Sequence, residues 1–342
     1  MIHNSIVPGD GGAVLTTPPM WKKGNLPTTF DVLSSLVYGA GKFVALNYGS
    51  NKAAYSTDGI NWIEVTLPVS ATWCSVCYGG GKFVGISRTA YSTTIIYSTD
   101  GITWTQATAN TNAFYTWTGV CYGNGVFISM SNVYDYGKDK TTSKYLYSTD
   151  GITWIDRDIT VGSSTIKRNW GAVGYGGGKF VALSNDGSKE AVYSTDGINW
   201  TKTTLPVNVQ WQAIYYGAGK FVAVGYGTSK LIDKGNGYYP TEIAAYSADG
   251  INWTQTTLPV SAEWRAICYG AGMFVAVAYY MVGTDKQASK SIAYSTDGIN
   301  WKLAKGTDDI RRESVFFGGG KFVVCTENAG NEYIEPTYKE LA

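Results

Sequence analysis

The chain has 342 residues, a formal net charge of +1 and only 15% charged residues, so it lacks the basic excess that binding to nucleic acid requires. Glycine supplies 42 residues. Aromatic residues make up 14%, too many for a disordered chain, and no apolar run reaches the roughly 18 residues of a transmembrane helix. We therefore expect neither a nucleic-acid partner nor membrane insertion. The first residues also lack the basic and apolar segments of a signal peptide.

The beginning of the chain repeats a pattern found later in it. Residues near 19–26 copy the Trp-x-x-x-x-Leu-Pro pattern of 200–206 and 253–259, one residue shorter. In the later copies this pattern would form the last strand of a repeated unit, and the seventh unit lacks such a strand. We therefore predict that residues near 19–26 pair with the last three strands and close a ring. Residues 1–17 are expected to form an N-terminal arm, and residues 18–342 the folded domain.

Two motifs recur along the chain and predict its fold. Aromatic-Gly-x-Gly-x-Phe, here called the glycine hairpin, occurs seven times, at Tyr38, Tyr78, Tyr122, Tyr175, Tyr216, Tyr269 and Phe317. Ser-x-Asp-Gly-Ile-x-Trp, here called the aspartate turn, occurs six times, around Asp58, Asp100, Asp150, Asp196, Asp249 and Asp297. A repeat of about 46 residues with two turn signals and no helical periodicity is typical of one four-stranded propeller blade. We predict an all-β, seven-bladed β-propeller of four-stranded antiparallel blades, closed by the N-terminal strand.

The fifth unit illustrates the expected strands. Residues 211–216 alternate in polarity and end at a glycine hairpin, which joins them to 220–224. Residues 243–246 and 251–256 form the outer two strands, connected by an Asp-Gly turn that favours a tight hairpin.

The five cysteines do not predict a metal site. Cys74 and Cys77 form a Cys-x-x-Cys pair, but the second pair or histidine cluster of a zinc site is missing, and His3 is the only histidine. We expect all five cysteines to be buried thiols, and we expect neither a metal nor a cofactor.

The aspartate turn resembles the Asp-box of sialidase-like (BNR-like) β-propellers. In that family the box stabilises the fold on the face opposite the ligand, and it is not catalytic. The same role follows from its chemistry, because the Asp carboxylate and the Ser hydroxyl can accept backbone N–H groups of the turn while the Trp fills space between sheets. The six aspartates are therefore expected to be structural.

The near-identical repeats, with their polar Gly-Asp-Gly-Gly lead-in, also resemble tail-associated receptor-binding proteins of phages and prophages. This resemblance implies recognition of a bacterial surface from a virion tail, and contact of residues 1–17 with other tail proteins.

The repeats differ on one face of the expected ring. The two motifs have constant length and share a face, here called the constant face. The loops between second and third strands lie on the opposite, variable face. From the hairpin Phe to the Tyr before the aspartate turn, the first six units span 12, 14, 20, 13, 25 and 20 residues. Because function concentrates on loops carried by a rigid frame, we expect the ligand over blades three to six of the variable face.

Loop tyrosines, tryptophans and arginines form three groups of candidate residues on that face. Aromatic faces stack on sugar C–H surfaces, and short polar groups bond to sugar hydroxyls, so the loop tyrosines indicate a carbohydrate ligand. The alternative is that these loops only cover the outer edge of the propeller. The second group consists of tryptophans five residues before each hairpin aromatic, here called the collar position, which either surround a central pocket or pack between blades. The predicted ligand-binding residues are Tyr134, Tyr136, Arg168, Trp170, Trp211, Tyr238, Tyr239, Trp264, Arg265 and Tyr280.

We found no catalytic constellation in the sequence. Sialidases of this architecture use three arginines, and although Arg88, Arg168, Arg265 and Arg312 could lie on the variable face, no arginine motif of that family is present. Glu263, Asp308, Asp309 and Glu313 are expected near the channel mouth as solvated charges, with no partner positioned for hydrolysis. We therefore expect non-catalytic recognition of a cell-surface glycan. A protein-binding scaffold and a sialidase-like glycoside hydrolase are the alternatives.

Overall fold

All regular structure in the described part of the chain is β-strand. The computed structural model describes residues 14–15, 22–27, 30, 32–89, 93–110, 115–133, 143–227, 240–278, 292–304, 312–326, 331–334 and 338–339. Within these ranges, no helix has the length and apolar character needed to cross a membrane.

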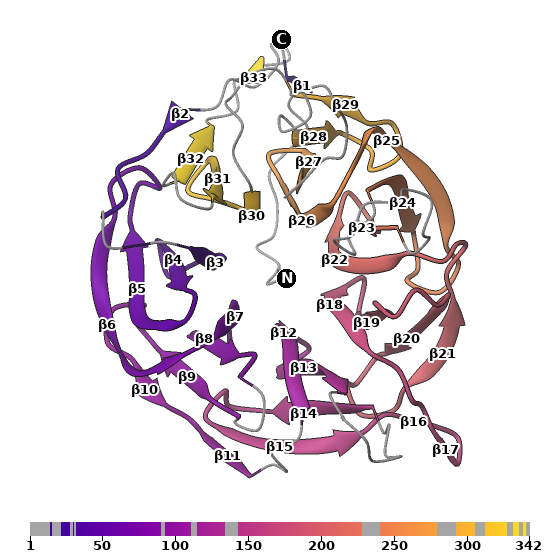
Figure 1. The fold of residues 1–342 in the computed structure, drawn as a ribbon. Coiled ribbons are helices and arrows are strands. Elements are labelled where there is room, and N and C mark those ends of the chain that lie inside the picture. Colours follow the sequence, from indigo (N-terminus) through magenta and orange to yellow (C-terminus); the bar gives the residue numbers. More distant parts are fainter. Residues whose placement is uncertain are drawn as a thin grey trace, which may run out of the picture.

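Seven antiparallel sheets surround a central axis, with their innermost strands toward the centre (Figure 1). Blade one contains β3 (Leu33–Gly39), β4 (Lys42–Asn47), β5 (Ser50–Ser56) and β6 (Ile63–Ala71). Blade two contains β7 (Trp73–Gly79), β8 (Lys82–Ser87), β9 (Ile95–Ser98) and β10 (Thr105–Gln106). Blade three contains β12 (Tyr115–Gly123), β13 (Val126–Val133), β14 (Lys144–Ser148) and β15 (Thr153–Asp158), with β11 (Thr108–Asn110) added in parallel to β15.

The remaining four blades follow the same order from the centre outward. Blade four contains β18 (Trp170–Gly176), β19 (Lys179–Ser184), β20 (Glu190–Ser194) and β21 (Thr201–Thr204). Blade five contains β22 (Gln210–Gly217), β23 (Lys220–Tyr226), β24 (Thr241–Ser247) and β25 (Thr254–Ala262). Blade six contains β26 (Trp264–Gly270), β27 (Met273–Ala278), β28 (Ile292–Ser295) and β29 (Lys302–Leu303). Blade seven contains β30 (Arg312–Gly318), β31 (Lys321–Thr326), β32 (Asn331–Ile334) and β2 (Lys22–Lys23). A short hairpin, β16 (Thr160–Val161) and β17 (Ser164–Thr165), lies between blades three and four.

The N-terminal strand closes the ring, as the sequence predicts. β2 pairs with β32 and supplies the fourth strand of blade seven, next to blade one in Figure 1. Just after β2, the backbone N–H of Asn25 donates to the carbonyl of Ile60 at 2.7 Å, and the N–H of Trp62 donates to the carbonyl of Asn25 at 3.2 Å. The closing segment thus binds both neighbouring blades. A second pairing joins β1 (Val14–Leu15) to β33 (Tyr338–Lys339); the domain boundary at residue 17 stays a prediction.

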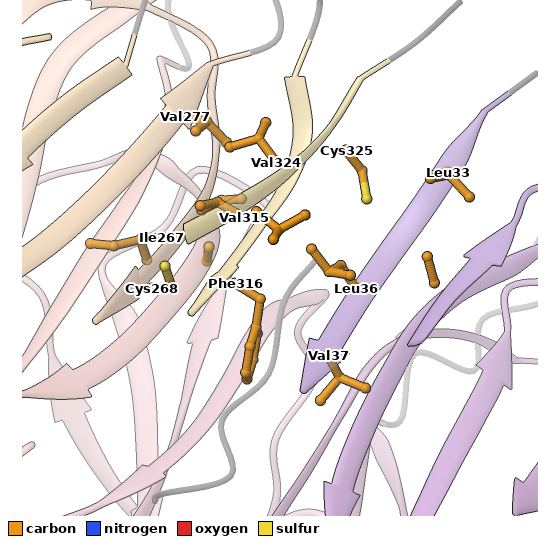
Figure 2. Packing of buried hydrophobic residues seen from close by; sticks show 14 of the residues in the cluster. Leu33, Leu36, Val37, Ile267, Cys268, Val277, Val315, Phe316, Val324 and Cys325 are labelled. Carbon is orange, nitrogen blue, oxygen red and sulfur yellow. The ribbon is translucent and has the colours of Figure 1, made fainter. Parts of the chain in front are cut away.

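Each blade also interlocks with the next through a glycine and an aromatic ring. The glycine that ends the innermost strand leaves space for the hairpin aromatic of the following blade. A Cβ atom added to Gly217 would lie 2.1 Å from Cγ of Tyr269, and one added to Gly318 would lie 2.1 Å from Cγ of Tyr38. The contact between Gly318 and Tyr38 joins the last blade to the first, so the interlock runs around the whole ring. Figure 2 shows buried side chains of β3 facing those of β30 and β31 across this junction.

The aspartate turns are hydrogen-bonded as their chemistry predicts. In the fourth blade, Oδ1 of Asp196 accepts the backbone N–H groups of Ile198 and Asn199, both at 2.8 Å, and the Ser194 hydroxyl at 2.9 Å. Burial alone would raise the pKa of Asp196, but these hydrogen bonds and that of the Asn199 amide hold the pKa well below its usual value. The pKa values of Asp58, Asp100, Asp150, Asp249 and Asp297 are lowered for the same reasons.

These carboxylates make the stability of the protein sensitive to acid. Because their pKa values are lower in the folded state, their contribution is present above the unfolded pKa of about 3.9 and is lost as the pH falls below it. We expect a melting temperature that falls progressively below about pH 4. Asp196→Ala should cost about 1–2 kcal/mol at pH 7, and this cost should shrink in acid. Thermal unfolding of both proteins between pH 3 and pH 8 measures this; a cost that does not change with pH would contradict it.

Candidate functional site

The variable face is formed by the ends of the second strands and the beginnings of the third strands. The loop tyrosines predicted to bind ligand, Tyr134, Tyr136, Tyr238, Tyr239 and Tyr280, lie outside the described residues. Their role therefore stays a prediction. The arginines and tryptophans of the predicted site are described, and they separate into buried and accessible groups.

The collar tryptophans pack inside the protein instead of surrounding a pocket. Trp170, Trp211 and Trp264 are each 0% exposed. The indole N–H of Trp264 donates to the carbonyl of Thr241, at the beginning of the third strand of the preceding blade, at 3.1 Å. A completely buried ring offers no surface to a ligand. These tryptophans therefore pack between blades, and they are not part of the candidate site.

Charged residues at the channel mouth are also more buried than the sequence suggests. Glu263 was expected to be a solvated charge, but it is 0% exposed, as is Arg312 at the collar position of blade seven. Oε2 of Glu263 lies 3.4 Å from Nη2 of Arg265. An ion pair near the axis explains how the carboxylate can be buried.

Arg265 joins blade six to blade five on the variable face. Its guanidinium carbon lies 5.5 Å from the ring centroid of Tyr226, in the geometry of a cation–π contact. The Arg265 side chain remains 23% exposed, so the cluster of Tyr226, Glu263 and Arg265 reaches the surface. Arg265 is among the residues predicted from the sequence, whereas Tyr226 is not. Tyr226 is the last residue of β23, immediately before the long segment that contains Tyr238 and Tyr239.

Arg168 forms the second accessible cluster, on blade four. Its Nε atom lies 2.6 Å from Oε2 of Glu190 and 3.8 Å from Oδ2 of Asp186, and Lys202 also binds Glu190. Burial alone would raise the pKa of Glu190, but the two cations lower it. Arg168 therefore lies in a nearly neutralised network and not in a site prepared for an anion.

One aromatic pair in the hydrophobic core joins blades five and seven. Tyr215 of blade five and Phe316 of blade seven make an edge-on ring contact with centroids 6.3 Å apart, past the intervening strand β26. Both are nearly completely buried, and they belong to the same core cluster as Cys268 of that strand; Figure 2 labels Phe316 and Cys268. Burial raises the pKa of the Tyr215 hydroxyl.

The cysteines belong to the packed interior. All five are buried free thiols, as expected, and burial raises the pKa values of Cys77, Cys121, Cys268 and Cys325. In the described ranges, the side chains of His, Cys, Asp and Glu form no group of three or more that could hold a metal ion.

Comparison with solved structures supports the propeller fold. Virginiamycin B lyase from Staphylococcus aureus superposes with a TM-score of 0.72 at 12% identity, covering 93% of this chain and 99% of its own. YCF48 bound to D1 peptide gives 0.62 at 14% identity, covering 95% and 97%. The WD40 β-propeller domain of Doa1 gives 0.60 at 12% identity, covering 95% and 97%. No protein-family model matches the sequence, and no curated protein matches it.

These similarities correct one expectation. The sequence led us to expect a protein without enzymatic activity, whereas virginiamycin B lyase, whose fold this chain shares almost throughout, is an enzyme. The expectation rested on missing glycosidase motifs, and a lyase need not contain them. Identities of 12–14% show the fold alone, and this fold is used by enzymes as well as by peptide-binding proteins. The chain is a β-propeller.

Proposed function

We propose that the chain recognises a cell-surface carbohydrate through its variable face, as a receptor-binding module of a phage tail. The observation that carries this proposal is the cluster of Tyr226, Glu263 and Arg265. It brings the Tyr226 ring and the Arg265 guanidinium together at the surface, groups that stack on sugars and bond to their hydroxyls, while the buried Glu263 carboxylate pairs with the guanidinium. The adjoining segment 228–239 adds Asn236, Tyr238 and Tyr239 in sequence.

The difference between the two faces supports the same assignment. On the constant face the same hydrogen bonds recur in every aspartate turn, so its aspartates are engaged in the fold. On the variable face, the described clusters of Arg168 and Arg265 differ in composition from blade to blade. A face that is free to vary on a rigid ring suits a receptor-binding role. The proposal that the protein belongs to a phage tail rests on the near-identical repeats and their polar Gly-Asp-Gly-Gly lead-in.

An array of bacterial-surface and host oligosaccharides tests the proposal, with the bound sugars analysed by mass spectrometry for turnover. We expect binding to at least one cell-surface oligosaccharide and to intact cells that display it. Mass spectrometry then tells whether the bound sugar is also cleaved. Failure to bind any oligosaccharide, together with capture of peptides from a matched peptide array, would contradict the proposal and favour a protein-binding scaffold.

The loop tyrosines give the proposal a site-directed test. Tyr238→Ala combined with Tyr239→Ala should leave the melting temperature within a few degrees but weaken binding about tenfold or more, because two stacking contacts can supply the 1.4 kcal/mol of a tenfold change. Titration of the double variant against the sugar selected by the array measures this. Asp196→Ala, on the constant face, is the matched control and should bind normally; unchanged affinity of the tyrosine variant would remove this loop from the site.

A further inference from the structure

Glu263 is the single residue between the last strand of blade five and the first strand of blade six. β25 ends at Ala262 and β26 begins at Trp264, and both of these neighbours are buried. Ala262 pairs with Thr241 at the beginning of β24, and the indole of Trp264 donates to the Thr241 carbonyl at 3.1 Å. The backbone on both sides of Glu263 is therefore fixed, which also fixes the place of its buried carboxylate.

Arg265 contacts both Glu263 and blade five. The β-bulge between Trp264 and Ala266 displaces Arg265 from the regular strand pairing. Its Nη2 donates to Oε2 of Glu263 at 3.4 Å, and its guanidinium carbon lies 5.5 Å from the ring centroid of Tyr226. Because the side chain of Arg265 is 23% exposed, the carboxylate of Glu263 helps to set where the guanidinium reaches the surface.

The junction between blades one and two is built in the same way from a nearly identical sequence. Residues 66–79 repeat residues 257–270. There Ala71 pairs with Ser50, and the indole of Trp73 donates to the Ser50 carbonyl at 2.9 Å. These are the same contacts as those between blades five and six.

The two junctions differ in charge. Thr72 and Cys74 stand where the later copy has Glu263 and Arg265. Because an uncharged pair forms the same junction, the fold does not require a carboxylate and a guanidinium at these positions. Burial of a carboxylate costs free energy even when the carboxylate is paired. The charged pair therefore calls for a role other than joining the blades.

We infer that Glu263 is a positioning residue of the proposed sugar-binding site. Its carboxylate holds Arg265 against Tyr226, and Arg265 donates hydrogen bonds to oxygen atoms of the sugar. Glu263 is itself buried, so it acts through Arg265 and does not touch the sugar. This inference rests on the proposed function and names the residue that sets the geometry of its site.

Exchange of the charged pair for the pair of the first junction separates binding from stability. Glu263→Thr combined with Arg265→Cys should melt within a few degrees of the unchanged protein, because Thr72 and Cys74 form the same junction. On the oligosaccharide array it should bind about tenfold more weakly or worse, since hydrogen bonds from a charged group are lost. Arg265→Cys alone should lower the melting temperature by about 4 °C or more, because the Glu263 carboxylate stays buried without this cation.

Glu263→Thr alone isolates the positioning role. It keeps the guanidinium but removes the carboxylate that holds it, so binding on the array should weaken nearly as much as in the double exchange. The NMR signal of the Arg265 Nε–H gives an independent readout, because the shift that the Tyr226 ring imposes on it should be lost. Glu64→Thr is the matched control, since Glu64 pairs with Lys52 at 3.3 Å on the outer strands of blade one, and it should bind normally.

The inference and the proposed function fail in different ways. If the unchanged protein binds oligosaccharides and Glu263→Thr binds them as tightly, the positioning inference is wrong and the proposed function stands. Normal binding by the double exchange would also overturn the inference, because it would remove Arg265 from the site. If no oligosaccharide binds, both are wrong.

Discussion

Removal of residues 1–27 should lower the melting temperature by at least about 4 °C and cause aggregation, because about 3 kcal/mol or more of closing interactions would be lost and the unfolding entropy is about 2.1 cal/mol/K per residue. The deletion removes β2, leaving β32 as an unpaired edge. It also removes Asn25, which hydrogen-bonds to Ile60 and Trp62 of blade one, and Leu26, which packs against the hydrophobic core.

Thermal unfolding and size-exclusion chromatography measure this effect. Deletion of residues 1–13 is the control, since it retains both β1 and β2. A protein that lacks residues 1–27 but stays monomeric with an unchanged melting temperature would show that β2 is dispensable and that the ring is held by other contacts.

Gly217→Ala should destabilise the protein by about 3 kcal/mol, at the upper end of the usual cost of overpacking. The added Cβ would lie 2.1 Å from Cγ and 2.5 Å from Cβ of Tyr269. These atoms lie near the backbone of β26, so the ring cannot swing away as the end of a flexible side chain could. Blades five and six would have to separate to admit the methyl group.

A double-mutant cycle with Tyr269→Ala isolates this steric cause. In the Tyr269→Ala background the contact with Cγ at 2.1 Å is removed and only the contact with Cβ at 2.5 Å remains. Gly217→Ala should therefore cost less than in the unchanged protein, and the two substitutions should be non-additive in urea unfolding. Equal costs of Gly217→Ala in both backgrounds would mean that backbone conformation, and not the interlock with Tyr269, explains the glycine.

The parts of the fold that repeat could be predicted from the sequence. The glycine hairpins and aspartate turns have fixed spacing, and each is stabilised by local interactions such as those of Ser194, Asp196 and Asn199. The closing strand could be predicted because residues near 19–26 carry the same pattern as other outer strands. A local pattern is sufficient where the stabilising contacts are themselves local.

The direction of the collar side chains could not be predicted, because it depends on the β-bulge. In the innermost strands, the register shifts between the collar residue and the second residue after it, as between Trp264 and Ala266. The extra residue reaches the channel mouth, as Arg265 does, while the tryptophan stays between blades. Alternation of polar and apolar residues does not show where a strand contains an additional residue.

Tyr226 could not be predicted for a different reason. It follows the strand partner of the collar residue, as Tyr48, Arg88 and Asn185 do in other blades. These residues differ in type, so no motif joins them, and their equivalence is visible only from strand pairing. The burial of Glu263 could not be predicted either, because its partner Arg265 approaches only through the geometry of the bulge.

Hydrogen–deuterium exchange tests the central claim, that the variable face binds carbohydrate, most directly. The protein is compared alone and saturated with the oligosaccharide that binds best on the array. We predict slower exchange in peptides that cover the ends of the second strands, around residues 47–50, 87–89 and 225–227, and no change in peptides that cover the aspartate turns. Protection concentrated at the aspartate turns, with the variable face unchanged, would contradict the account.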